Sequence, residues 1–182
     1  MTVAVAVVNG GRHLVGGLKW VEGIPVSSEG GIDLLEELQS RIGHKFANSD
    51  LLQEALIQSA DMPVPPGIRS NSKLAWLGDA VMNLFVSEHL YDLMAGDHLG
   101  ALDHARQAIV IEESVAQAAN ELDLPRHLTT SGGRPIPPQH LGPRAMAQAF
   151  EAIVGALYLD AGAESARDLV RKSLGLKPRD RS

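Results

Sequence analysis

The chain has 182 residues, 45% of them hydrophobic and 21% charged, and its 16 basic and 22 acidic residues give a net charge of −6. This length and composition are typical of one globular domain with a buried core. The sequence contains no cysteine, which excludes disulfide bonds and thiolate metal sites. No run of apolar residues approaches the ~18 that a membrane-spanning helix needs, so a membrane protein is not expected.

The charge is distributed unevenly along the chain. The last twelve residues hold five basic residues and one acidic residue, a net charge of +4, so the first 170 residues carry −10. A domain that binds an RNA backbone by itself usually has a basic face, because neutralising phosphates dominates the affinity. The first 170 residues, with their net charge of −10, show little indication of a basic face. Two interpretations of the basic tail remain open, a solvated chain end and a tether for RNA or a partner.

The first 31 residues differ from the rest. Two β-prone runs, TVAVAVV and RHLVGGLKWVEG, flank a turn sequence that begins at Asn9, which predicts a small β-hairpin. A docked or disordered appendage and an organelle-targeting segment are the alternatives. We therefore expect an N-terminal extension over residues 1–31, a domain over residues 32–176 and a basic tail over residues 177–182.

From Ile32 onward every periodic segment is helical, so the fold class is predicted to be all-α. Asp33 is expected to start a first helix that ends near Ile42, and Asn48 is expected to cap a second. The segment MPVPPG at residues 62–67 must interrupt the helices, because proline removes a backbone donor and restrains the residue before it. Later helices are expected at residues 71–94, 102–122, 144–161 and 164–174, with a long loop at 129–143.

Residues 71–91, NSKLAWLGDAVMNLFVSEHLY, are expected to form an apolar helix with an acid near its middle. At 3.6 residues per turn, Ser72, Ala75 and Asp79 share one face. The core side of this helix is expected to consist of Leu74, Leu77, Val81, Leu84 and Phe85. A buried carboxylate needs a metal ion or a polar partner, so the sequence predicts a site at Asp79.

Four segments resemble, in the right order, the motifs of ribonuclease III domains. Residues 71–82, NSKLAWLGDAVM, are similar to the signature helix N-E-x-L-E-F-L-G-D-A-V-L. Residues 38–59 resemble the opening motif, with Ile57-Gln58 where Thr-His is usual, and residues 106–124 and 148–160 resemble two later motifs. The resemblance implies the all-α ribonuclease III endonuclease-domain fold, without the double-stranded RNA-binding domain that usually follows it.

The resemblance also implies which residues would form a catalytic site. Members of the family cleave duplex RNA with Mg²⁺, which is held by carboxylates from two helices. Carried over position by position, Asp79 and Glu151 are the retained acids, and both are expected to keep residual catalytic and metal-binding roles. Ser72, Ala75 and Gln148 are degenerate positions, where the family has Glu, Glu and Asp. Two of the four metal-binding acids, those at positions 79 and 151, therefore remain.

The remaining acids leave three interpretations open. Asp79 and Glu151 can hold one weak Mg²⁺, with or without competent catalysis, or they can serve packing alone, with Gln148, Asn83 or water as partners. A further family acid falls near Leu99 and is also lost. A two-metal arrangement is not expected, and no other cofactor is indicated.

Trp76 occupies the position of a family aromatic that packs across a dimer interface. The resemblance therefore implies a homodimer, or a heterodimer with a related chain, in which the helices at 71–94 pair about a two-fold axis. An ordinary core tryptophan is the alternative. Large aromatic anchors often dominate interfaces, which favours the dimer.

Two functions follow from these expectations. The first is a divergent ribonuclease III-like protein of RNA processing or of a ribonucleoprotein, with weak or lost cleavage of double-stranded RNA and a scaffold role as a dimer. Noncatalytic family members are structural proteins of mitochondrial ribosomes, so an intracellular location is expected, with the mitochondrion as one candidate. The second function is a fold taken over for work without RNA, such as protein docking or small-molecule chemistry in the dimer cleft.

Overall fold

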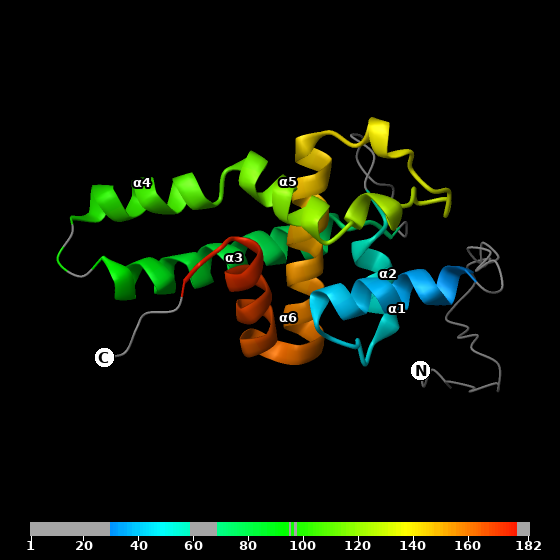
Figure 1. Ribbon diagram of the computed structural model, residues 1–182, viewed down its shortest axis with the longest axis horizontal. Coiled ribbons are helices and arrows are strands. Elements are labelled where there is room, and N and C mark those ends of the chain that lie inside the picture. Colours follow the sequence, from blue (N-terminus) through cyan, green and yellow to red (C-terminus); the bar gives the residue numbers. More distant parts are fainter. Residues whose placement is uncertain (1–29, 59–68, 95, 97, 178–182) are drawn as a thin grey trace, which may run out of the picture.

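The computed structural model describes residues 30–58, 69–94, 96 and 98–177 (Figure 1). These residues form α-helices and short 3₁₀ helices and no strand, which confirms the predicted all-α fold. The elements are α1 (Gly30–Ile42), α2 (Ser49–Ala55), α3 (Ser72–Leu93), α4 (Leu99–Ile109), α5 (Glu112–Glu121), η1 (Leu124–Arg126), η2 (Pro138–His140) and α6 (Pro143–Ser173). In this part of the chain no helix is long and apolar enough to span a membrane.

Three of the expected features lie outside the described residues. They are the β-hairpin, which falls within residues 1–29, the proline-rich break at 62–67, and the basic tail beyond Lys177. The end of the first helix at Ile42 is confirmed, and α1 begins at Gly30, three residues before the expected start.

Helix α6 lies at the centre of the molecule and crosses α3 (Figure 1). It packs most extensively against α3 and α5, and it also contacts α2 and η1. Much of the core comes from the side of α6 that faces these helices. Each of the following side chains is at most 1% exposed: Phe150, Ile153, Val154, Leu157 and Val170.

Two glycines allow the close approach of α3 and α6. A Cβ atom on Gly78 would overlap with the carbonyl oxygen of Glu151, and a Cβ atom on Gly155 would overlap with that of Leu74. Only glycine, which has no Cβ, permits a crossing in which the two backbones touch in this way. The crossing brings Asp79, the residue after Gly78, close enough to Glu151 for the two charges to interact.

Helix α6 is interrupted at Gly162, where φ is 82° and ψ is −174°. The residues after Gly162 turn back alongside the first part of the helix (Figure 1). The separate helices expected at residues 144–161 and 164–174 are therefore confirmed.

Asp160, just before this turn, anchors the connection between α1 and α2 to α6. Its side chain is 3% exposed and accepts hydrogen bonds from His44 Nε2 (2.8 Å), from the Ala47 backbone (2.9 Å) and from the Asn48 backbone (2.8 Å). Burial alone would raise the pKa of Asp160, but these hydrogen bonds hold it below its ordinary value. Asn48 accepts a hydrogen bond from the backbone of Asp50 and so caps α2, as predicted.

The prediction of one helix over residues 102–122 is wrong, because the chain forms two helices there, α4 and α5. Ile111 has an extended backbone, with φ −62° and ψ 150°, and separates them. The β-branched run at residues 109–111 favours extended backbone. Glu112 and Glu113 then occupy the first turn of α5, where negative charge is favourable.

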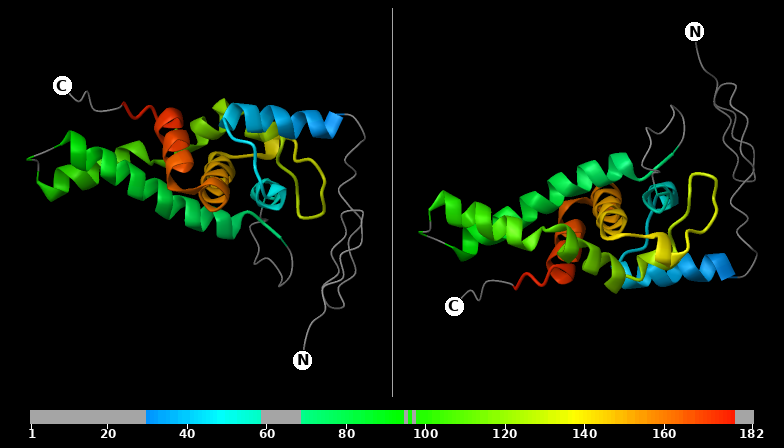
Figure 2. Two further views of the ribbon diagram at one scale, coloured as in Figure 1. Left: turned by 90° about the horizontal axis from the view of Figure 1, so that it is seen from below. Right: turned by 90° about the horizontal axis from the view of Figure 1, so that it is seen from above.

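The C-terminal half of α3 and helix α4 form an arm that extends from the body of the molecule (Figures 1 and 2). None of the 11 residues of α4, all of them described, is buried. Leu84, expected in the core, is 53% exposed, so that prediction is wrong. The physical reason is that α6 crosses α3 near Gly78 and covers only one side of it. The other core residues expected on this helix are buried or partly buried.

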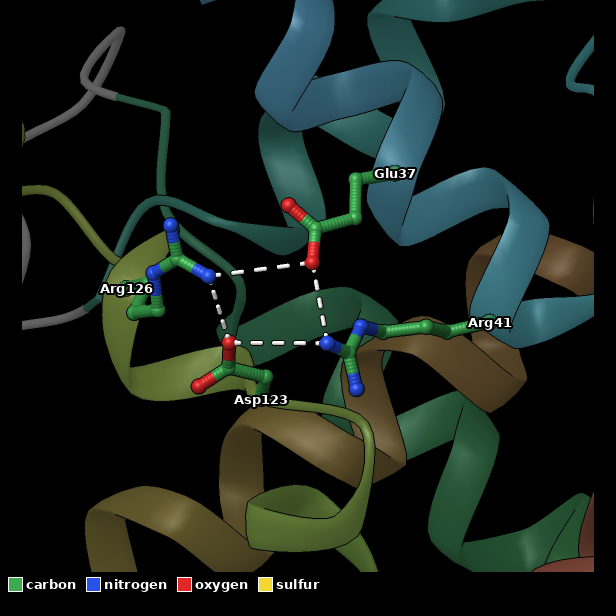
Figure 3. A network of polar contacts seen from close by, with 4 residues as sticks. All are labelled: Glu37, Arg41, Asp123 and Arg126. Atoms are coloured by element: carbon green, nitrogen blue, oxygen red, sulfur yellow. Dashed lines mark hydrogen bonds and ion pairs between the residues drawn. The ribbon is translucent and has the colours of Figure 1, made fainter.

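Helix α1 is tied to η1 by ion pairs between two arginines and two carboxylates (Figure 3). Arg41 Nη2 lies 2.9 Å from Glu37 Oε1, and Arg126 Nη1 lies 2.9 Å from Asp123 Oδ2. The cross contacts are longer, 3.7 Å between Arg126 and Glu37 and 3.9 Å between Arg41 and Asp123. The hydrogen bond from Arg41 lowers the pKa of Glu37. Exposed pairs of this kind add little stability, so their main effect is to orient α1.

Candidate functional site

Asp79 and Glu151 approach each other where α3 crosses α6. Glu151 is partly buried, and its pKa is raised to about 7, first by burial and then by the negative charges of Asp79 and Glu112. The two acids retained from the motifs therefore lie close enough to interact, as the sequence predicts. A carboxyl group with a pKa near 7 is present in both protonation states at neutral pH.

Asp79 itself is exposed, so the prediction of a buried acid at this position is wrong. It lies one residue, about 100° of helix rotation, from Gly78 and so stands at the edge of the crossing. Asn83 Nδ2 donates one hydrogen bond to Asp79 Oδ1 and one to the backbone oxygen of Asp79, both of 2.9 Å. Asn83 is one of the partners expected from the sequence, and it restrains the orientation of the Asp79 carboxylate.

Glu112 is a third carboxylate near this site that the sequence analysis did not identify. It lies in the first turn of α5, and its negative charge contributes to the raised pKa of Glu151. The signal in the sequence was the acidic pair Glu112-Glu113, which is typical of a helix start. An expected continuous helix over residues 102–122 concealed that signal, because it placed the pair in mid-helix.

Gln148, one turn before Glu151 on α6, belongs to a closed ring of three amide side chains. Gln148 Nε2 donates to Asn71 Oδ1 (3.1 Å), Asn71 Nδ2 donates to Gln58 Oε1 (3.2 Å), and Gln58 Nε2 donates to Gln148 Oε1 (3.3 Å). Asn71 is fully buried, and the two glutamines are partly buried. A neutral, hydrogen-bonded side chain therefore occupies the position where the ribonuclease III motif has an aspartate.

The other degenerate positions differ in their surroundings. Ser72 adjoins the amide ring, with its Oγ 3.5 Å from Gln148 Nε2. Ala75 is 4% exposed and belongs to the core. Leu99, near which the motif places a further acid, is 73% exposed on α4, at the arm rather than at the crossing. None of these positions adds a carboxylate to Asp79 and Glu151.

Asp79 and Glu151 are the retained acids that could hold a divalent cation at the crossing. In the described residues, no group of three or more His, Cys, Asp or Glu side chains is arranged to hold a metal ion. Mg²⁺ commonly binds one or two carboxylates and completes its octahedral shell with water. Asp79 and Glu151 match that donor set for a single ion, and the cation would have to displace the proton that Glu151 holds near neutral pH.

Exposed large apolar side chains are a second feature of α3. Trp76 is 79% exposed, so within a single chain it is not a core residue. Leu84 and Tyr91 follow it along the same side of the helix and are 53% and 78% exposed. Both line a groove of about 750 Å³ that lies between α3, α4 and the end of α6, together with Leu99 and Arg171.

The family described as ribonuclease-III-like matches residues 48–177. The chain is 40% identical over 138 residues to ribonuclease 3 of Bdellovibrio bacteriovorus, which covers 75% of this chain and 59% of that protein. It is 36% identical over 134 residues to ribonuclease 3 of Symbiobacterium thermophilum, which covers 74% of this chain and 57% of that protein. The chain thus spans less than two thirds of the length of these relatives.

A solved structure has the same fold. The nuclease domain of ribonuclease III from Campylobacter jejuni, described for structural flexibility in a region involved in dimer formation, matches with a TM-score of 0.65 and 31% sequence identity. The match covers 77% of this chain and 95% of that domain. With a family match over most of the chain, relatives above 35% identity and a common fold, the chain belongs to the ribonuclease-III-like family.

Proposed function

We propose that this chain is a divergent ribonuclease III-like protein of RNA processing or of a ribonucleoprotein, in which cleavage of duplex RNA is weak or lost. The observation that carries the proposal is the composition of the α3–α6 crossing. Asp79 and Glu151 remain there, whereas Ala75 is apolar and Gln148 is held in a neutral amide ring. The relatives are named ribonuclease 3. A ribonuclease activity is therefore the one that the loss of the acids at positions 75 and 148 would weaken.

The chemistry of cleavage explains why the loss matters. A two-metal site stabilises both the attacking and the leaving oxygen of a phosphate, and the ions lie about 4 Å apart between several carboxylates. Asp79, oriented by Asn83, and Glu151 would supply ligands for one ion. A single ion held there would supply charge for polarising a phosphate or a water molecule, but the two carboxylates would not place a second ion at the other oxygen. The expected result is slow cleavage or none.

A cleavage assay tests this proposal. Purified chain is incubated with end-labelled duplex RNA and Mg²⁺ or Mn²⁺, beside a family member that carries all four acids. We expect turnover at least about 100-fold below that of the comparison enzyme, because even changes behind the metal ligands cost 10- to 100-fold. Comparable turnover that disappears in Asp79→Asn would contradict the proposal.

We also propose that two copies of α3 pair, in a homodimer or in a heterodimer with a related chain. The exposed apolar side of α3, which carries Trp76, Leu84 and Tyr91, supports this, since such patches commonly mark interfaces. Helix α4, with no buried residue, also gains a neighbour in a dimer. The similar nuclease domain from Campylobacter jejuni has a region involved in dimer formation.

A second candidate function is work without RNA, in which the fold docks a protein or a small molecule. The groove between α3, α4 and the end of α6 favours it, because apolar Leu84, Tyr91 and Leu99 lie there beside charged Asp92 and Arg171. A salt-dependent binding assay with duplex RNA separates the two functions. A Kd weaker than ~10⁻⁴ M at low salt, the weak end of nonspecific binding, favours this second candidate.

A further inference from the structure

Two of the positions at which the chain departs from the family motifs, those of Gln58 and Gln148, are in contact with each other. Gln58 stands where the opening motif has histidine, and Gln148 stands where the last motif has aspartate. They are 90 residues apart in the sequence, and Gln58 Nε2 donates a hydrogen bond of 3.3 Å to Gln148 Oε1. Two departures that meet in space are more simply explained as one coupled change than as two independent losses.

Asn71 closes these two glutamines into a ring with a consistent direction. Each of the three amides donates one hydrogen bond and accepts one within the ring. Within the ring, the fully buried Asn71 thus donates one hydrogen bond and accepts one, both to neutral side chains. A carboxylate at position 148 would break this pattern, because it accepts hydrogen bonds but donates none.

The ring joins three parts of the chain that frame the crossing. Gln58 follows α2, and its backbone N–H bonds to Thr129 O at 2.8 Å. Asn71 immediately precedes α3, and its backbone N–H bonds to Ile57 O at 2.7 Å. Gln148 lies on α6, three residues before Glu151 and so on the same side of the helix. Fixing Gln148 therefore fixes the rotation of α6 that directs Glu151 toward α3.

A negative charge at position 148 would also change the electrostatics of the crossing. Asp79 and Glu112 are each already close enough to Glu151 for their charges to act on it. A fourth carboxylate would add repulsion between like charges, and a divalent cation is the natural partner to relieve it. The neutral ring avoids that requirement.

We propose that Gln58, Asn71 and Gln148 act together as positioning residues that align α6 with α3, and so Glu151 with Asp79, without a divalent cation. The inference rests on the proposed weak or lost cleavage, since a crossing built around two ions would need cations for its alignment. Melting experiments without RNA test the ring alone, and the cleavage assay tests the function alone. The two can therefore fail separately.

The test is a set of thermal melts of the full chain, in EDTA and in 1 mM Mg²⁺ or Mn²⁺. The wild-type Tm is expected to change by no more than about 1 °C with the cation, since a site with a millimolar Kd adds little stability. Gln148→Asp is expected to lower Tm in EDTA by about 4–8 °C, because the buried Asn71 loses the hydrogen bond that Gln148 donates to it. Added cation is expected to restore at least half of that loss, which a purely structural glutamine would not produce.

Two further variants sharpen the test. Gln58→His combined with Gln148→Asp is expected to recover at least half of the Tm loss in EDTA, because the imidazole donates to the new carboxylate. Gln139→Asp, an exposed glutamine in η2, is the matched control and is expected to leave Tm unchanged with or without cation. If Gln148→Asp does not fold, a double-mutant cycle takes its place. It compares the Tm losses of Gln58→Ala, Gln148→Ala and the double alanine variant, and so measures the coupling between the two glutamines.

Three results would overturn the inference. The first is a wild-type Tm that rises with cation as much as the Tm of Gln148→Asp does. The second is a Tm loss in the Gln58→His and Gln148→Asp double variant that equals the sum of the two single losses. The third is the same additivity of Tm losses among the three alanine variants. Each would show that the glutamines stabilise the fold independently, or that the native crossing depends on a cation.

Discussion

The two sides of α3 are built in different ways. On the side that faces α6, glycines at positions 78 and 155 bring two backbones together, and the neighbouring side chains are buried or joined by hydrogen bonds. Away from this crossing Trp76, Leu84 and Tyr91 stand exposed, and Leu84 and Tyr91 line the groove between α3, α4 and the end of α6. The first side is complete within one chain. The second is apolar and exposed, as surfaces that pack against a partner chain commonly are. Substitutions on the first side should therefore change the stability of the fold, and substitutions on the second should change assembly.

Gly78→Ala should have the largest effect, because it acts on the side of α3 that is complete. The new methyl group would overlap with the backbone of Glu151, which cannot rotate away as a side chain can. We expect a loss of about 3 kcal/mol or more in the free energy of unfolding, measured by urea denaturation. Gly132→Ala in the exposed loop, where the nearest atom is the Thr130 hydroxyl at 3.8 Å, is the matched control. Equal losses in the two variants would show that the helices do not touch at Gly78.

Trp76→Glu tests the exposed side of α3. Removing an aromatic anchor from the middle of an interface typically costs 2 kcal/mol or more, so we expect the dimer to weaken by at least about 30-fold. Light scattering across a concentration series should show monomers where the wild type is a dimer, with little change in Tm at low concentration. Leu159→Glu changes a leucine that is 54% exposed on α6 and should leave assembly unaltered. A wild type that is monomeric at micromolar concentration contradicts the homodimer.

Glu151 should make the stability of the crossing depend on pH. Its pKa in the folded chain is about 7 against an ordinary 4.5, so the folded state binds more protons between these values. Stability is then highest below about pH 4.5, falls as the pH rises toward 7, and levels off above it. Glu151→Gln should remove this dependence and raise stability at pH 8 by about 1–3 kcal/mol in EDTA. Parallel pH profiles for the variant and the wild type would refute the assignment.

Asp160 should show the opposite dependence with a smaller effect. The pKa of Asp160 is lowered in the folded chain from its ordinary value of 3.8. Its contribution to the free energy of unfolding is therefore fully present above pH 3.8 and is lost as the pH falls through the pKa of the folded state. Asp160→Asn should cost about 1–2 kcal/mol at pH 6, because two backbone donors and His44 lose a charged acceptor. The difference between the two proteins should shrink in urea melts below pH 3.8. A constant difference across that range would show that the charge of Asp160 does not matter.

The sequence predicted the parts of the fold that depend on local pattern or on family motifs. Helical periodicity and the motifs together predicted an all-α fold and the approach of Asp79 to Glu151. The break between α4 and α5 was missed, because the apolar period continues through the β-branched residues before Glu112. The exposure of Leu84 was also missed, because periodicity gives the apolar side of a helix but not how much of it a neighbour covers.

The amide ring lay beyond sequence reasoning for a different reason. Gln58 and Gln148 appear in the sequence as two separate departures from the motifs, and local patterns do not report a contact between residues 90 positions apart. Asn71 offered no signal either, since it matches the motif. Long-range hydrogen bonds of this kind become visible only when the packing of α2, α3 and α6 is known.

Counting the divalent ions that the native chain binds tests the central claim most directly. Isothermal titration with Mn²⁺ should show no more than one ion per chain, with a Kd weaker than about 10⁻⁴ M, and no binding in Asp79→Asn. Two ions per chain bound with micromolar affinity would contradict the account, because the crossing would then hold the full metal complement that its side chains are proposed to have lost.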